Sequence, residues 1–97
     1  DPADVAAIEE ALRMFGVLRE LTGSDVDPPD SETPQLSYAL AGKVELPTDD
    51  KLVLLRELSE RRRVELVQEL LEGAVLTAQR VRRAAERAST NGKVDIG

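Results

Sequence analysis

The residues that most often carry out catalysis are scarce in this 97-residue chain. Histidine and cysteine are both absent, which removes imidazole bases, thiolate nucleophiles, disulfides and the zinc sites built on these ligands. A serine nucleophile would therefore need a lysine or a carboxylate as its base. Neither Lys43, Lys51 nor Lys93 lies in a segment that predicts burial. We therefore expect the chain not to be an enzyme.

Carboxylates are abundant, and two pairs are adjacent in sequence, Glu9-Glu10 and Asp49-Asp50. Carboxylate pairs do acid-base chemistry when a closed site separates their pKa values. Both pairs fall in helical segments whose apolar faces point elsewhere, which favours a solvated face or a complement to the helix dipole. The acids of residues 24–33 lack the central glycine and final glutamate of a calcium loop. We expect no metal and no cofactor.

Phosphate binding would have to use the second half of the chain. Residues 1–50 carry 3 basic and 12 acidic groups, whereas residues 51–97 carry 10 and 7. Asn91-Gly92-Lys93 lacks the upstream glycine and the following hydroxyl residue of a phosphate loop. The arginines of 61–63 and 80–87 have no aromatic neighbours on which bases would stack. We interpret them as solvated sides of a helix, and nucleic acid is disfavoured as a partner.

Apolar spacing identifies the elements that hold these residues. Apolar side chains recur three and four positions apart, the period of one helix face, over residues 2–22, 34–44, 49–58 and 60–89. Asp1, Thr33, Thr48 and Ser59 are the candidate helix caps, and Gly23 is a candidate stop. Residues 24–33 form an acidic, proline-rich loop, and residues 93–97 read as a frayed tail.

The pattern predicts an all-α fold, namely an irregular four-helix bundle with two short central helices and one long C-terminal helix. One domain, residues 1–92, contains all four helices. The last helix would be about 45 Å long at 1.5 Å per residue, so its far half should project from the core or lean on another surface. Gly16, inside the first helix, favours close packing of a neighbouring helix at that point.

One face of the long helix repeats small and aliphatic residues in a four-three rhythm typical of a coiled-coil seam. The seam residues are Val67, Leu71, Ala74, Ala78, Val81, Ala85 and Ala88. Alanine dominates the end of the seam, so a helix pair formed there would be close and small. Pairing between two copies of the chain is therefore one way to use this helix.

No stretch approaches the roughly 18 apolar residues of a membrane span, and no apolar signal-peptide core stands near the start. We expect no membrane association and a cytoplasmic location. The chain begins with Asp1-Pro2, which favours a segment of a longer protein.

From Leu36 onward, the order of features resembles the helical second half of the Lon protease N-terminal, substrate-binding domain. A short helix with small residues leads to a leucine-proline turn, then to a helix with a lysine and a double leucine, then to an arginine and a leucine-rich helix. The matching segments are 36–41, 44–47, 50–55, 57–63 and 66–71. The first helix would match the helix that precedes these elements, so the resemblance covers about residues 5–72. Leu52 departs from the glutamine usual in that family, and the β-rich first half of the domain has no counterpart.

The resemblance implies a non-catalytic module that binds unfolded or tagged protein segments in an ATP-dependent proteolysis or protein quality-control system. Exposed apolar side chains would make the contacts, since unfolded chains offer surfaces that folding would hide. The alternative is a structural oligomerisation module that pairs through the long C-terminal helix. The candidate protein-binding residues for the two functions are Met14, Phe15, Tyr38, Leu71, Val75 and Val81.

Overall fold

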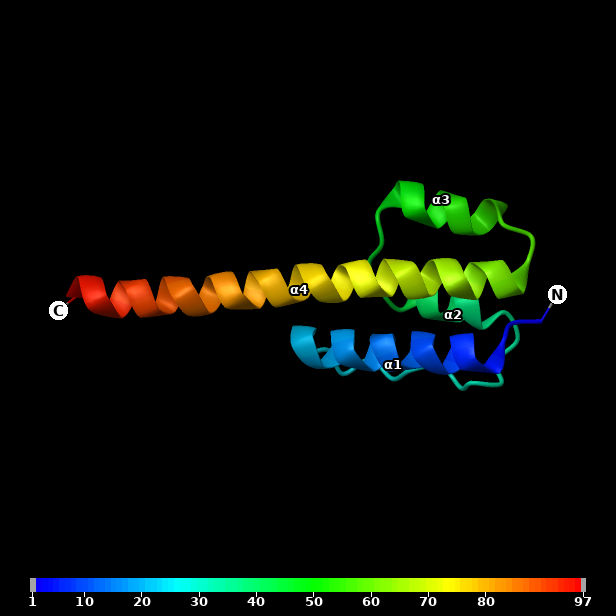
Figure 1. Ribbon diagram of the computed structural model, residues 1–97, viewed down its shortest axis with the longest axis horizontal. Coiled ribbons are helices and arrows are strands. Elements are labelled where there is room, and N and C mark those ends of the chain that lie inside the picture. The colour runs from blue at the N-terminus through cyan, green and yellow to red at the C-terminus, as the bar shows by residue number, and fades with distance from the viewer. Residues whose placement is uncertain (1, 97) are drawn as a thin grey trace.

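A computed structural model of the protein describes the backbone of residues 2–96 and the side chains of residues 2–89. It contains helices α1 (Val5–Thr22), α2 (Leu36–Gly42), α3 (Thr48–Arg56) and α4 (Glu60–Ile96), and no strand within that part of the chain. Figure 1 shows α4 as one long rod with the other three helices grouped along its first half. The predicted all-α bundle, with two short central helices and a long C-terminal helix, is confirmed.

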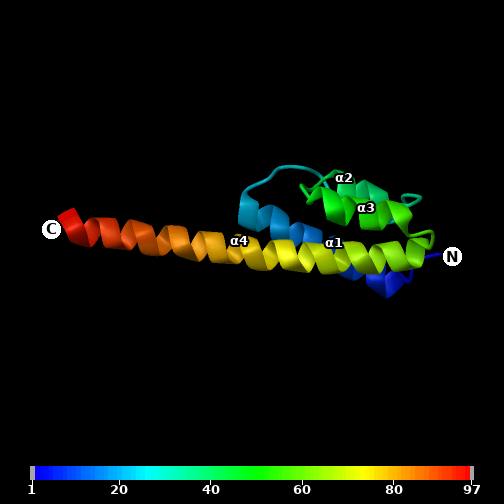
Figure 2. The same ribbon diagram turned by 90° about the horizontal axis from the view of Figure 1, so that it is seen from above.

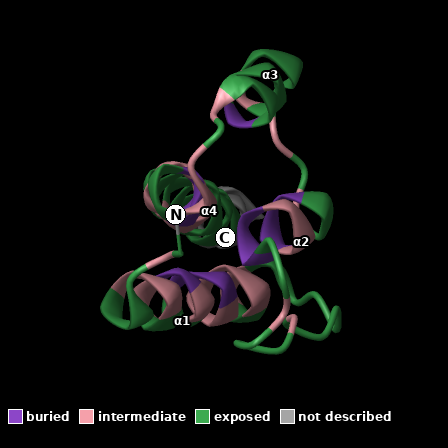
Figure 3. Ribbon diagram, turned by 90° about the vertical axis from the view of Figure 1, so that its right-hand side faces the viewer, coloured by how far each residue is buried: buried purple, intermediate pink, exposed green. Residues whose placement is uncertain are grey.

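The core lies where α1 and α2 meet the first half of α4. Figure 3, seen along α4, places α1, α2 and α3 around it, with α2 between the other two. The buried apolar side chains come from all four helices, but α3 contributes a single one. They are Ala11, Met14, Phe15, Leu36, Leu40, Ala41, Leu54, Val64, Val67, Leu71 and Val75.

Helix α1 is closed at both ends by groups that its own sequence supplies. Asp4 caps its start, and its side-chain Oδ1 accepts a hydrogen bond from the Ala6 amide at 3.2 Å. Asp1, the cap expected from the sequence, lies outside the described residues. Gly23 ends the helix with φ of 68°, and the next amide, of Ser24, donates to the Arg19 carbonyl at 3.1 Å. This is the Schellman arrangement, which glycine allows without a Cβ penalty.

The two short helices begin next to prolines. Residues 24–34 cross from the end of α1 to α2 without a helix, and the acids of this loop are exposed. Gln35, in the left-handed region at φ of 51°, precedes α2, so Thr33 does not supply the cap. Pro47 stands at the N-cap position of α3 and Thr48 is its first residue. The helices span 36–42 and 48–56, against 34–44 and 49–58 in the sequence prediction.

Helix α4 begins at the predicted place and continues further than its apolar pattern does. Ser59 caps it, because its Oγ accepts a hydrogen bond from the Arg62 amide at 3.2 Å. The helix passes through Gly73 and Gly92 and ends at Ile96, whereas the sequence predicts an end near residue 89 and a tail over residues 93–97. A glycine lowers helix stability by about 1 kcal/mol without forcing a stop.

The far half of α4 gives the molecule its elongated outline. The principal extents are 61 × 25 × 19 Å, and both side views show α4 extending well past the end of α1. Figure 2 shows that it remains one continuous helix without a sharp kink. Every side chain of residues 80–89 is exposed. We call residues 80–89 the arm.

The expectation of close packing at Gly16 is wrong. A Cβ added at Gly16 would meet nothing within 4 Å. Neighbouring Phe15 and Met14 are buried instead, because they point towards α4 while Gly16 points past it. The glycine is therefore not required for helix contact.

Candidate protein-binding surface

Four of the six predicted contact residues belong to the core. Phe15 and Leu71 are 3% and 0% exposed, and Met14 and Val75 are 9% and 5% exposed. They come from the faces on which α1 and α4 pack together. These side chains hold the helices together and present no surface of their own to a partner in this structure.

The other two predicted residues are accessible but lie far apart in the fold. Tyr38, in α2, is half-buried, and its ring lies 4.5 Å from the guanidinium carbon of Arg63. Val81, on the arm, is 64% exposed. The structure does not bring the six predicted residues together into a single site.

A polar cluster that the sequence did not predict joins α2 to the start of α4. Arg63 is buried; its guanidinium donates to Ser37 Oγ at 3.2 Å, to Glu60 Oε1 at 3.2 Å and to the Glu57 carbonyl. Glu60 Oε2 accepts from the Ser37 amide at 3.1 Å, and its Oε1 accepts from Ser37 Oγ at 2.5 Å. Glu60 therefore caps α2, which has no side-chain cap of its own.

This cluster corrects the interpretation of Arg61–Arg63 as a uniformly solvated side. Arg61 and Arg62 are exposed, but Arg63 is not. Every hydrogen bond of the cluster joins protein groups, and among the described residues no buried side-chain nitrogen or oxygen lacks a partner. Arg63 therefore has partners for its buried donors and ties the ends of three helices together.

The acidic side chains do not form a candidate metal site in the described part of the chain. No three acidic side chains group there as a metal ion would require. A hydrogen bond from Arg13 lowers the pKa of Glu10, and the same contact raises the pKa of Arg13. This pair is an exposed (i, i+3) contact on α1, with a nitrogen-oxygen distance of 2.6 Å.

The exposed apolar side chains concentrate around α3. Leu54 is the one buried residue of this helix, while Leu52, Val53 and Leu55 are 41%, 49% and 64% exposed. Leu58, which follows the helix, is 92% exposed. We call Leu52, Val53, Leu55 and Leu58 the α3 surface. Large apolar side chains gathered in this way mark sites of protein interaction.

Open cavities flank Leu54 beneath α3. One, of about 170 Å³, lies between α2 and α3, and one, of about 130 Å³, lies between α3 and α4. Tyr38, Lys51 and Leu55 line the first, and Val53 and Leu66 line the second. Helix α3 thus packs on the rest of the protein mainly through Leu54, and the apolar walls on both sides of Leu54 are accessible.

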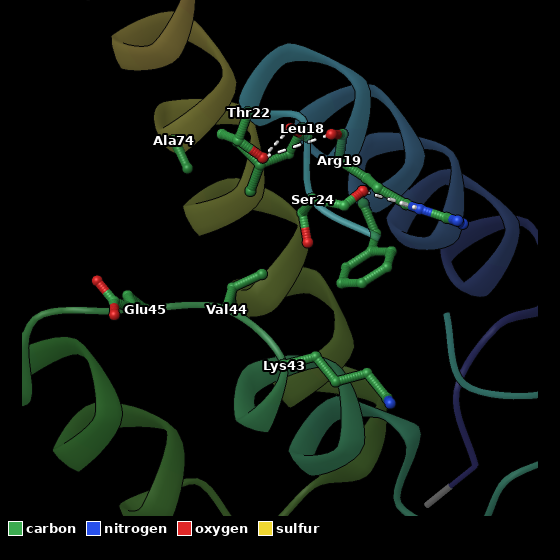
Figure 4. A pocket seen from close by; sticks show the side chains of 9 residues that line it. Leu18, Arg19, Thr22, Ser24, Lys43, Val44, Glu45 and Ala74 are labelled. Atoms are coloured by element: carbon green, nitrogen blue, oxygen red, sulfur yellow. Dashed lines mark hydrogen bonds between the residues drawn. The ribbon is translucent and has the colours of Figure 1, made fainter. Parts of the chain in front are cut away.

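A larger hollow lies beyond the end of α2, where the chain turns away towards α3. Two adjacent cavities of about 350 and 560 Å³ share Leu18, Thr22, Glu45 and Ala74, and we call them together the trough. Figure 4 shows its first part, with Leu18 and Thr22 of α1 facing Val44 of the 43–47 connector and Ala74 of α4 to one side, next to Thr22. Glu45, Asp50 and Glu69 add three carboxylates to the walls.

The seam of α4 leads from the core through the trough to the arm. Val67 and Leu71 are covered by neighbouring helices, Ala74 and Ala78 are half-buried, and the later positions are exposed. We call the uncovered part the stripe; its residues are Ala74, Ala78, Val81, Ala85 and Ala88. The arm around it carries four arginines and one glutamate, a net charge of +3. Arg82 and Glu86 form an exposed ion pair at 3.7 Å.

Comparison with known proteins adds no relative: no family model, no curated protein and no solved structure matches this chain. Within the described residues, no helix is long and apolar enough to cross a membrane. The candidate surfaces are therefore those that the chain itself defines, the α3 surface and the stripe with its trough.

Proposed function

We propose that the chain is a non-catalytic, cytoplasmic protein-binding module that recognises apolar segments of unfolded or tagged proteins. The observation that carries this proposal is the α3 surface, where Leu55 and Leu58 are 64% and 92% exposed. Burying one leucine or valine side chain fully is worth about 1.5–3 kcal/mol. Covering this group of side chains would release enough free energy to offset the ordering of a short bound segment.

The loose seating of α3 supports the same function. An apolar side chain of a bound segment can enter the cavities on either side of Leu54 without displacing a well-packed core. The walls there are mainly apolar, with Lys51 on one side and Asp50 and Glu69 on the other. Such a surface selects for apolar content and tolerates differences in sequence, which suits recognition of many unfolded proteins.

The proposed setting is an ATP-dependent proteolysis or protein quality-control system. It rests on the resemblance of about residues 5–72, carried mainly by residues 36–71, to the helical half of the Lon substrate-binding domain. The α3 surface falls within that region, at the helix with the double leucine Leu54-Leu55. Recognition of unfolded clients would then belong to this module, and cleavage to another part of the system.

The proposal is tested by binding to one protein in two states. A fluorescently labelled, reduced and carboxymethylated secretory protein supplies the unfolded probe, and its native disulfide-bonded form supplies the folded one. Fluorescence anisotropy should detect binding of the unfolded form only. The Leu55→Asp/Leu58→Asp variant should weaken that binding about tenfold or more, because two charges replace the apolar contacts.

Leu76→Asp provides the matched control, since Leu76 is 53% exposed but lies on α4, outside the α3 surface. This variant should bind as the native chain does. Circular dichroism should show the same helix content in all three proteins. Equal affinity for folded and unfolded probes, or equal losses in the two variants, would contradict the proposal.

The alternative function, a structural oligomerisation module that pairs through α4, is favoured by a separate observation. The stripe is uncovered over the whole arm, and Val81 at its centre is 64% exposed. A helix pair along the stripe would cover it. Sedimentation equilibrium distinguishes the two functions, because pairing requires a dimer whose population rises with concentration and ignores unfolded protein.

A further inference from the structure

We propose that the trough is completed by the arm of a second copy of this chain, in an antiparallel dimer with two-fold symmetry. The inference deepens the alternative function above and rests on it, since it names the partner and the orientation of the pairing. Each copy would contribute its arm to the other copy's trough, and each trough is incomplete without that arm.

The position of α2 leaves room for the second arm. Helix α2 has seven residues and packs at the first turns of α4, where Ser37 meets Glu60. After Gly42 the chain leaves this face for α3, while α1 continues alongside α4 as far as Thr22. The trough is the space that α2 would fill if it were longer. The arm of a second copy, entering the trough from the side on which this copy's own arm projects, would lie in line with α2.

The stripe is nearly the same when read in either direction from Val81. Ala74 and Ala88 are each seven residues away, and Ala78 and Ala85 are three and four residues away. Two stripes laid antiparallel with Val81 against Val81 therefore place small residues opposite small residues along their whole length. Alanine at these positions permits close approach of the two helix backbones. This register puts Ala88 of one copy beside Ala74 of the other, inside the trough.

Charge favours this register over one in which the arms alone meet. Each arm carries a net charge of +3, so contact limited to the arms would set arginines against arginines. Glu69 and Arg87 lie about five helical turns apart on the same side of α4. A two-fold axis keeps that side common to both copies. In this register Arg87 of one copy stands opposite Val75 of the other, about 9 Å along the helix from Glu69. Its charge therefore acts on the acidic trough wall of Glu45, Asp50 and Glu69 as a whole.

Symmetry also closes the assembly. The stripe and trough of one copy meet the trough and stripe of the other, so both surfaces are used and no open-ended chain results. The α3 surface lies on a different helix and stays available for other proteins. Pairing and client binding are therefore separable in this molecule.

Disulfide cross-linking tests the orientation, and the absence of native cysteine makes single-cysteine variants direct reporters. Ala74→Cys and Ala88→Cys are mixed in equal amounts and oxidised. The antiparallel register predicts 74–88 cross-links between the two variants and little linkage of Ala74→Cys to itself. Parallel pairing predicts the reverse, and that result would overturn the proposal while leaving pairing through α4 intact.

Sedimentation equilibrium of the full chain tests the stripe. Val81→Asp should weaken the dimer about tenfold or more, because it buries a charge twice at the symmetry axis. Leu76→Asp, a similarly exposed site on the other side of α4, is the control and should leave the dimer intact. A native chain that stays monomeric at every concentration would overturn both this inference and the alternative function.

A charge exchange tests the trough. Arg87→Glu and Glu69→Arg should each weaken the dimer several-fold, and the double variant should recover part of the loss. Arg83→Glu makes the same change in charge one helical turn nearer to the symmetry axis, and so further from the acidic wall of the other copy, and should have a smaller effect. If the two arginine variants had equal effects and the double variant showed no recovery, the trough would not be the site that binds the arm.

Discussion

Arg63 is the residue on which the junction of three helices depends. It is 5% exposed and joins Ser37 at the start of α2, the Glu57 carbonyl at the end of α3 and Glu60 at the start of α4. The guanidinium group suits this role because it offers several donors in fixed directions, whereas lysine offers a single point charge. The junction therefore depends on arginine geometry as well as on positive charge.

Replacement of Arg63 by alanine should destabilise the fold by about 3 kcal/mol, because it leaves Glu60 without its cation and empties a buried site. Glu60 keeps its hydrogen bonds from Ser37 and some solvent contact, which holds the loss near the lower end of the range for broken buried pairs. Urea denaturation followed by circular dichroism measures it. Arg63→Lys should fall between the two proteins.

Arg61→Ala is the control for this prediction, since Arg61 is exposed and belongs to the same run of three arginines. Its effect should stay within about 0.5 kcal/mol. If Arg61→Ala and Arg63→Ala were equally mild, the polar cluster would have no role in stability. The three arginines look alike in the sequence, and burial of the third depends on where α2 begins in space. Helical periodicity alone does not contain that information.

At the scale of elements, two glycines differ in whether the local backbone conformation requires a glycine. Gly23 is needed where it is, because φ of 68° is costly for other residues. Gly16 lies in a helical segment with open space in front of it. The two glycines therefore predict opposite responses to the same substitution.

Gly16→Ala should stabilise the protein by about 1 kcal/mol, since alanine is the better helix former and its methyl group meets no neighbour. Gly23→Ala should destabilise it by about 1 kcal/mol, since it forces a Cβ into the left-handed region. Thermal and urea denaturation of both variants at one protein concentration would measure the pair. A destabilised Gly16→Ala variant would mean that a close contact forms at that position after all.

The order and type of the helices followed from the sequence because apolar spacing, capping residues and prolines act locally. Ser59 and Gly23 begin and end helices as their types predict. The looseness of α3 did not follow, because Leu52, Val53, Leu54 and Leu55 are equally apolar in sequence and the fold buries only Leu54. Likewise, the sequence does not show that Phe15 and Leu71 are buried in the core, where they cannot contact a partner.

On the scale of the whole molecule, the acidic and basic parts of the chain lie in different regions of the fold. The acidic first half supplies the loop of residues 24–34 and two of the trough carboxylates, Glu45 and Asp50. The basic arm extends away from them along α4, towards the far end of a molecule that is 61 Å long. Within one copy these opposite charges cannot meet, because the arm is part of a straight helix. Between two antiparallel copies they can.

The proposed dimer should therefore weaken as salt is added. Exposed ion pairs contribute about 0.2–1 kcal/mol each, and the two-fold symmetry makes each pair occur twice. In 1 M sodium chloride the screening length falls to about 3 Å, so these attractions are largely lost. The dissociation constant of the dimer should therefore rise about fivefold or more between dilute buffer and 1 M salt. Sedimentation equilibrium across a salt series measures this change. The Arg87→Glu variant should lose most of the salt dependence because the main attraction is already absent. If the alanine stripe alone held the dimer, salt would leave its stability unchanged or increase it, since burial of apolar surface does not depend on screening. That outcome would support pairing through α4 but would show that the trough carboxylates do not contact the second copy.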